Sequence, residues 1–111
     1  MKAMLLMRSD GSYTEGEQAA DYAAWAEYEE SLKRDGVFLA SSQFDSEAAR
    51  AIRTELSSTS RDDRTENPPI DAAGTLVGYY MVECTDLDEA ARYARRAPLY
   101  GFVEVYPISA E

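Results

Sequence analysis

The pattern of apolar and polar residues predicts four strands. Residues 2–8 (KAMLLMR) form a short apolar run that ends in the turn residues SDGS, which indicates a buried strand. Residues 37–44 (VFLASSQF) predict a second strand. Residues 75–84 (TLVGYYMVEC) are rich in β-branched and aromatic residues, and they give the clearest strand of the chain. The segment YGFVEVYPI predicts the last strand.

A first helix is predicted between the first two strands. Ser12 or Thr14 can cap its start, and it runs to about Asp35. Gly36 then takes the usual position of a glycine after a helix C-terminus. Glu29 lies inside the broad apolar face of this helix. The other side chains of that face are Tyr22, Trp25, Tyr28 and Leu32.

A second helix is predicted to begin in the segment TDLDEA. Asp86 can cap it, and Glu89, three residues later, completes a capping-box-like pattern. Pro98 ends the helix, because proline cannot continue it. A narrow apolar stripe with helical spacing consists of Leu87, Ala90, Ala91, Ala94 and Ala97.

Residues 45–73 leave two interpretations open. The segment ARAIRTE fits a strand in which Ile52 and Thr54 alternate, and it also fits a helical turn that begins at Ser46. The segment after it, SSTSRDDRTENPPID, is polar and rich in turn residues, which indicates an exposed loop.

The predicted order of elements is strand, helix, strand, one optional strand, strand, helix and strand. This is the split βαβ order of an α+β fold, in which two helices cover one face of an antiparallel sheet. We find no internal repeat and no long linker, so residues 1–111 are expected to form a single domain. The opposite face would carry Tyr, Val, Met and Phe side chains, and an exposed patch of that kind favours association. The sequence therefore predicts a homodimer that joins two sheet faces.

Composition narrows the classes of function. The 111 residues carry a formal net charge of -10, with 11 Lys and Arg against 21 Asp and Glu, and no His. Phosphate contacts need basic patches, so neither nucleic acid nor an anionic membrane is expected as a partner. The lack of His excludes a His-based acid/base mechanism. With one Cys and no carboxylate spacing typical of a metal site, we expect neither a metal nor a cofactor.

The sequence also favours one compartment. The single cysteine, Cys84, excludes an internal disulfide and fits a reducing environment. The apolar run near Met1 is too short for a signal peptide and lacks a small-residue cleavage site. No run approaches the roughly 20 apolar residues of a membrane span. A cytoplasmic protein is therefore expected.

Several segments resemble one known family. MKAMLLM is similar to that family's first strand, and YAAWAEYEESLKRDG resembles its aromatic-rich first helix ending in Gly. The pattern LDEA…A…P…G…VEV, between residues 87 and 105, is the most specific part. On these residues, and across essentially its whole length, the chain resembles the YCII-related (DGPF-domain) proteins. The resemblance implies a ferredoxin-like α+β fold that dimerises into an α+β barrel, with a cleft between the sheet, the first helix and a hairpin loop.

The family's DGPF motif is altered in this chain. It corresponds to Glu66, Asn67, Pro68 and Pro69 in the segment TENPPID. Glu keeps a carboxylate and Asn tolerates the positive φ that Gly supplies, but the aromatic residue is lost. In the closing strand, Tyr106 stands where the family usually has Arg. We interpret the loop as a remnant of the family's site, in which Glu66 retains the capacity for chemistry.

The candidate site residues follow from this resemblance and from the pattern of aromatic residues. Glu66 or Asp71 is the candidate catalytic base, held by a stiff loop, and Tyr80 is its candidate polar partner. The candidate ligand-binding residues are Tyr22, Trp25, Glu29, Asn67 and Tyr106. A structural role stays open for each of them, as a solvated acidic turn for the carboxylates and as core or interface packing for the aromatic rings.

Glu29 raises a separate question, because burial of an unpaired carboxylate is expensive. The side chain must pair, take up a proton, face a cavity or reach water at an edge. Arg8 and Arg53 are candidate partners. In a wet pocket its pKa would rise, which would make it a candidate base. Arg8 can instead form a cross-strand ion pair with Glu104.

These observations predict a protein that binds a small, partly aromatic or apolar organic molecule in a cleft of each subunit. Two alternatives stay open. One is a small-molecule enzyme of lyase, isomerase or hydrolase type that uses a carboxylate base, because the resemblance includes a few relatives that act on small ring compounds. The other is an accessory protein linked to transcription regulation, because some relatives are associated with sigma factors. Its acidic surface would then meet a basic partner.

Overall fold

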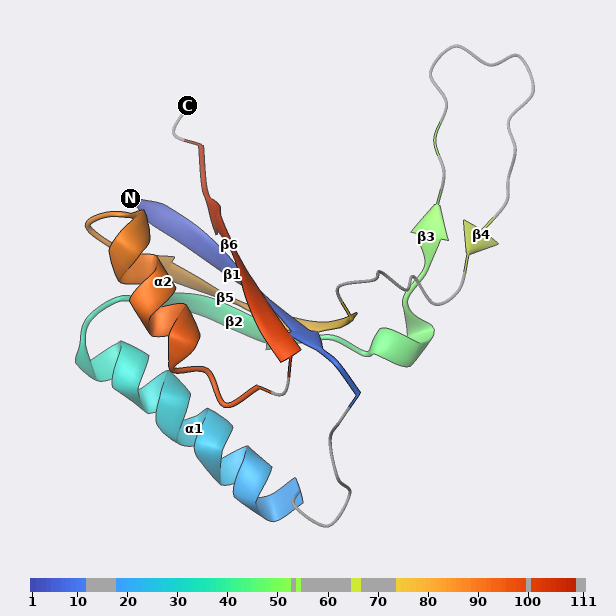
Figure 1. The fold of residues 1–111 in the computed structure, drawn as a ribbon, viewed down its shortest axis with the longest axis horizontal. Coiled ribbons are helices and arrows are strands. Elements are labelled where there is room, and N and C mark those ends of the chain that lie inside the picture. The colour runs from blue at the N-terminus through green and yellow to red at the C-terminus, as the bar shows by residue number, and fades with distance from the viewer. Residues whose placement is uncertain (12–17, 53, 55–64, 67–73, 100, 110–111) are drawn as a thin grey trace.

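The computed structural model describes residues 1–11, 18–52, 54, 65–66, 74–99 and 101–109. These residues form a four-stranded antiparallel sheet with two α-helices, and a separate two-stranded sheet (Figure 1). The main sheet has the order β2-β5-β1-β6, with β1 at Lys2–Ser9, β2 at Phe38–Gln43, β5 at Thr75–Glu83 and β6 at Gly101–Pro107. Because this is the strand order of a ferredoxin-like split βαβ fold, the predicted architecture is confirmed.

Helix α1 (Gln18–Arg34) ends at the predicted glycine. Gly36 has a φ of 74°, a left-handed conformation that glycine adopts without steric cost. Its amide donates to the carbonyl of Lys33 at 3.1 Å, and the amide of Val37 donates to that of Leu32 at 3.1 Å. These two bonds form a Schellman motif, which turns the chain directly from α1 into β2.

Helix α2 (Leu87–Arg95) begins at the predicted cap. The carboxylate of Asp86 accepts a hydrogen bond from the amide of Glu89 at 2.8 Å. Ala90 and Ala94 of the predicted stripe are buried, whereas Leu87 at its start is 44% exposed. Within the described residues, no helix is long and apolar enough to cross a membrane.

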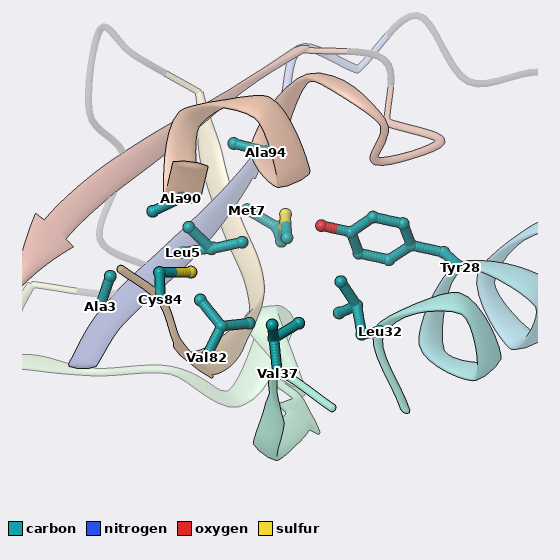
Figure 2. Close-up of a cluster of buried hydrophobic side chains, with 10 residues drawn as sticks. All are labelled: Ala3, Leu5, Met7, Tyr28, Leu32, Val37, Val82, Cys84, Ala90 and Ala94. Atoms are coloured by element: carbon teal, nitrogen blue, oxygen red, sulfur yellow. The ribbon is translucent and has the colours of Figure 1, made fainter. Parts of the chain in front are cut away.

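One hydrophobic core holds the helices on the sheet (Figure 2). Ala3, Leu5 and Met7 alternate along β1 with the more exposed residues between them, so all three point to one face. The core side chains that pack with them are Tyr28 and Leu32 from α1, Val37, Val82, Cys84, and Ala90 and Ala94 from α2. Because both helices contribute to this one cluster, they cover the same face of the sheet.

The opposite face of the sheet also carries large apolar side chains. Met4 pairs with Met81 and Leu6 pairs with Tyr79 across the central strands. Since side chains alternate along a strand, these four lie away from the face that carries the core. All four are half-buried, although both described α-helices lie on the other side of the sheet.

For residues 45–73 the sequence left a helical turn and a strand as alternatives, and the described part of this segment contains both. Ser46–Ala48 forms a short 3-10 helix, η2, and Ala51–Ile52 forms strand β3. Strand β3 pairs with β4 (Thr65–Glu66), and Figure 1 shows this pair beside the main sheet and separate from it. The first alternative, a helical turn that begins at Ser46, corresponds to η2. The second alternative, a strand that includes Ile52, corresponds to β3.

Candidate functional site

The described residues line a partly open pocket of about 570 Å³ between α1 and the ends of β2 and β5. Its aromatic lining residues are Tyr22, Trp25 and Tyr80, together with Tyr79, whose side chain alternates to the opposite face of the sheet. Its polar lining residues are Ser9, Glu29, Ser41, Ser42 and Gln43. The volume and the mixture of aromatic walls with a few polar groups are typical of a small-molecule site.

Tyr80 is the centre of the aromatic wall. Its ring stacks on Trp25, with centroids 5.9 Å apart and planes 12° from parallel. Tyr28 meets the same ring edge-on at 5.2 Å, and Phe38 does so at 6.4 Å. Trp25 and Tyr28 are three residues apart on α1, so both face the sheet from one side of the helix. These contacts fix the Tyr80 ring at the base of the pocket.

Glu29 supplies a carboxylate to the pocket. The Ser41 hydroxyl donates to its Oε1 at 2.7 Å, and the Lys33 ammonium lies 3.4 Å from its Oε2. Neither partner is among those that the sequence suggested. The Arg8 Nε donates to the Oε1 of Glu104, which confirms that predicted ion pair and corrects the suggestion that Arg8 pairs with Glu29. Arg53 lies outside the described residues.

The Tyr80 hydroxyl keeps its proton well into the alkaline range. Burial, and secondly the negative charge of Glu29, raise its pKa from 10.0 to about 12. At neutral pH this hydroxyl is therefore protonated and can donate a hydrogen bond. Burial likewise raises the pKa of Tyr28, whose hydroxyl donates to the carbonyl of Tyr93 at 2.9 Å.

The raised pKa of Tyr80 predicts a loss of stability at alkaline pH. Between pH 10 and about 12 the unfolded chain loses this proton while the folded chain keeps it, so the free energy of unfolding falls as pH rises. The Tyr80→Phe variant should lose less stability over this window than the parent protein. Urea unfolding at a series of pH values between 9 and 11.5 measures the difference.

The matched control for this titration is Tyr22→Phe, because the Tyr22 side chain is 69% exposed. It removes the same functional group from a position largely in solvent. If Tyr80→Phe and Tyr22→Phe have equal alkaline slopes, burial of the Tyr80 hydroxyl is not the cause.

The structure brings together four of the predicted site residues, namely Tyr22, Trp25, Glu29 and Tyr80. It places Tyr106 elsewhere, because Tyr106 pairs with Met4 on the face opposite the core. Tyr106 is 50% exposed, and its hydroxyl donates to the Oε2 of Glu104 at 2.9 Å.

The remaining predicted residues come from the altered loop. The backbone of Glu66 belongs to β4 and pairs with Ala51, away from the described lining of the pocket. Asn67 and Asp71 lie outside the described residues. Their roles as base and ligand contact stay predictions.

The sequence interpretation missed the polar end of β2. Ser41, Ser42 and Gln43 all line the pocket, and Ser41 fixes the Glu29 carboxylate. The sequence does indicate this polar end, because the apolar run VFLA changes abruptly to SSQ within one predicted strand. Pro98 and Leu99, just after α2, close another side of the pocket and were also missed.

The described residues contain no group of three or more Cys, Asp or Glu side chains arranged to hold a metal ion. The polar side chains in the described part of the lining are one carboxylate, hydroxyls and an amide. This set is suited to hydrogen bonding with an organic ligand.

Comparison with known proteins identifies the family of the chain. A family model described as "YCII-related domain" matches residues 1–110. The chain belongs to the YCII-related family. A comparison with curated proteins gave no match.

Among solved structures, this YCII-related protein is similar to 5-chloro-2-hydroxyhydroquinone dehydrochlorinase (TftG) from Burkholderia phenoliruptrix AC1100, in complex with 2,5-dihydroxybenzoquinone. The TM-score is 0.55 and the sequence identity is 16%, with 100% of this chain and 96% of the other chain covered. At this identity the likeness establishes the shared α+β fold alone.

Proposed function

We propose that this YCII-related protein binds a small planar organic molecule in the pocket between α1 and the sheet. The observation that supports this most is the stack of Trp25 on Tyr80 beside the Glu29 carboxylate and the Ser41 hydroxyl. Aromatic faces supply apolar contact area for a ring, and the polar groups fix its orientation. The volume of about 570 Å³ is within the range of about 300–1,000 Å³ for such sites.

The structural neighbour TftG supports a small ring compound as the ligand. TftG is a dehydrochlorinase, and its structure holds 2,5-dihydroxybenzoquinone, a single six-membered ring. A pocket with aromatic walls on the same fold suits a molecule of this size. The accessory-protein alternative expects an exposed patch without a deep cleft, so the pocket favours ligand binding.

Binding can be measured directly, because Trp25 is the single tryptophan of the chain and lines the pocket. A set of small ring compounds is titrated while Trp fluorescence and the unfolding temperature are recorded. A true ligand should change the fluorescence. At a concentration of about 100 times its Kd it should add about 2.7 kcal/mol of stability, a rise of roughly 10 °C.

The variant Ser41→Leu is expected to abolish this response, because the larger side chain enters the pocket and removes the hydroxyl beside Glu29. Ser109→Leu makes the same change at an exposed position and should bind like the parent. If no ring compound responds, or if Ser41→Leu binds as well as Ser109→Leu, this pocket is not the ligand site.

An enzyme remains the second candidate, because Glu29 and the protonated Tyr80 hydroxyl line one pocket. A carboxylate base beside a hydroxyl donor is a pair that can move a proton from a bound ring. Glu66 or Asp71 stays the alternative base that the family resemblance implies. The test is exchange of ring protons with deuterated water, followed by NMR, and it should be slower in Glu29→Gln if Glu29 is the base.

We also propose that the protein is a cytoplasmic homodimer, joined through the faces that carry Met4, Leu6, Tyr79 and Met81. Two such faces would bury each other's apolar side chains, which is the usual source of stability in a dimer of small subunits.

A further inference from the structure

We propose that the pocket selects a planar ring with a positively charged nitrogen group, such as an aryl amidine or a protonated heteroaromatic amine, with its N–H donors bound to Glu29. This inference rests on the proposed binding function, and it adds the chemical class of the ligand. It also separates this pocket from one that prefers aromatic acids or other anionic rings.

The described lining of the pocket carries a negative charge. Glu29 is the single charged side chain among the described residues that line it. Tyr22, Trp25 and Tyr80 also line the pocket, and an aromatic ring attracts a cation through the negative part of its quadrupole. A ligand carboxylate would meet this negative charge without any Lys or Arg in the described lining to pair with it.

The Glu29 carboxylate has room for further donors. A carboxylate offers about four acceptor positions, and the Ser41 hydroxyl occupies one of them on Oε1. Lys33 approaches Oε2 at 3.4 Å, with the two side chains 47% and 31% exposed. Such a partly exposed ion pair contributes little to stability, so a ligand cation can displace the lysine.

Lys33 also contacts a second group, the aromatic ring of Phe38. Its ammonium lies 5.2 Å from the centroid of the Phe38 ring, a cation–π distance. When a ligand cation takes the carboxylate, Lys33 keeps this contact. The Glu29 carboxylate is therefore a hydrogen-bond acceptor in the pocket, and Lys33 is only weakly bound to it.

The negative charge of Glu29 also acts on Tyr80, which lines the same pocket. This charge is the second cause, after burial, of the raised pKa of Tyr80. The repulsion that disfavours a tyrosinate at this position also disfavours a ligand anion beside it, and it favours a ligand cation.

Three ring compounds of nearly the same shape test the proposal: benzamidine, which is a cation, benzamide, which is neutral, and benzoate, which is an anion. Each is titrated into the full chain, with excitation of Trp25 at a wavelength that spares the ligands. Benzamidine should bind about tenfold or more tightly than benzamide, and benzoate should bind most weakly. The preference for benzamidine should shrink as salt is added, because the attraction is between charges.

The Glu29→Gln variant should lose about tenfold in affinity for benzamidine and change its affinity for benzamide by less than about twofold. Glu30→Gln is the matched control, because it makes the same charge change one residue along α1 at an exposed position. The Lys33→Gln variant removes the competing cation and should increase benzamidine affinity about twofold or more.

The outcomes separate the two proposals. If benzoate or benzamide binds as tightly as benzamidine, or if Glu29→Gln keeps the parent's preference, the ligand class is wrong while the binding function stands. If none of the three compounds binds and no other ring compound does so, the proposed function fails and this inference fails with it.

Discussion

The Leu32→Ala variant is expected to lower the free energy of unfolding by about 2–5 kcal/mol. Leu32 is fully buried at 0% exposure, between α1 and the sheet, in the cluster that includes Leu5 and Val82 (Figure 2). The substitution removes apolar contacts and leaves a cavity, since a close-packed core relaxes incompletely around a missing group. A domain of this size has a total stability of about 5–15 kcal/mol, so the loss is a large fraction of it.

Urea unfolding followed by circular dichroism measures this loss. Leu39→Ala is the matched control, because Leu39 is 44% exposed and the same truncation there should have an effect below about 1 kcal/mol. Equal losses for the two variants would contradict the buried position of Leu32.

The Leu32→Ala variant should also affect the pocket, because Leu32 lies on α1. Leu32 is one turn from Glu29 and two turns from Trp25, so it holds the part of the helix that forms one wall of the pocket. A looser helix should weaken ligand binding as well as stability. Leu39→Ala should leave binding unchanged.

Local patterns were sufficient to predict most of the fold. The β-branched and aromatic run of residues 75–84 appears as β5, and the glycine and aspartate signals at Gly36 and Asp86 mark real helix ends. These features depend on hydrogen bonds between residues close in sequence, which a sequence displays directly. The strand order then follows from the sequence of elements.

The contacts of the site were less predictable, because they depend on how distant elements meet. Glu29 reaches Ser41 through the approach of α1 to β2, and no local pattern specifies that approach. Its pairing with Lys33 was available from the spacing of four residues on a helix, and the sequence interpretation overlooked it. Tyr106 was assigned to the cleft by family position, whereas strand register puts it on the opposite face.

The variant Met81→Lys is expected to convert the proposed homodimer into a monomer. Met81 pairs with Met4 across the central strands, on the face that carries no core side chains. In a two-fold dimer each substitution occurs twice, so two unpaired charges would enter the seam between the sheets. An uncompensated buried charge costs about 3–5 kcal/mol, which corresponds to a rise in the dimer Kd of a hundredfold or more.

Light scattering at micromolar concentration measures the result. The parent protein should have a mass of about twice 12.4 kDa, and Met81→Lys should have a mass near 12.4 kDa. Circular dichroism must show that the variant is folded, so that dissociation is separated from unfolding. Leu87→Lys is the control, because Leu87 is 44% exposed on α2 and lies in the helix layer, outside the proposed seam. A parent mass near 12.4 kDa, or the same dissociation in Leu87→Lys, would contradict a dimer built through this face.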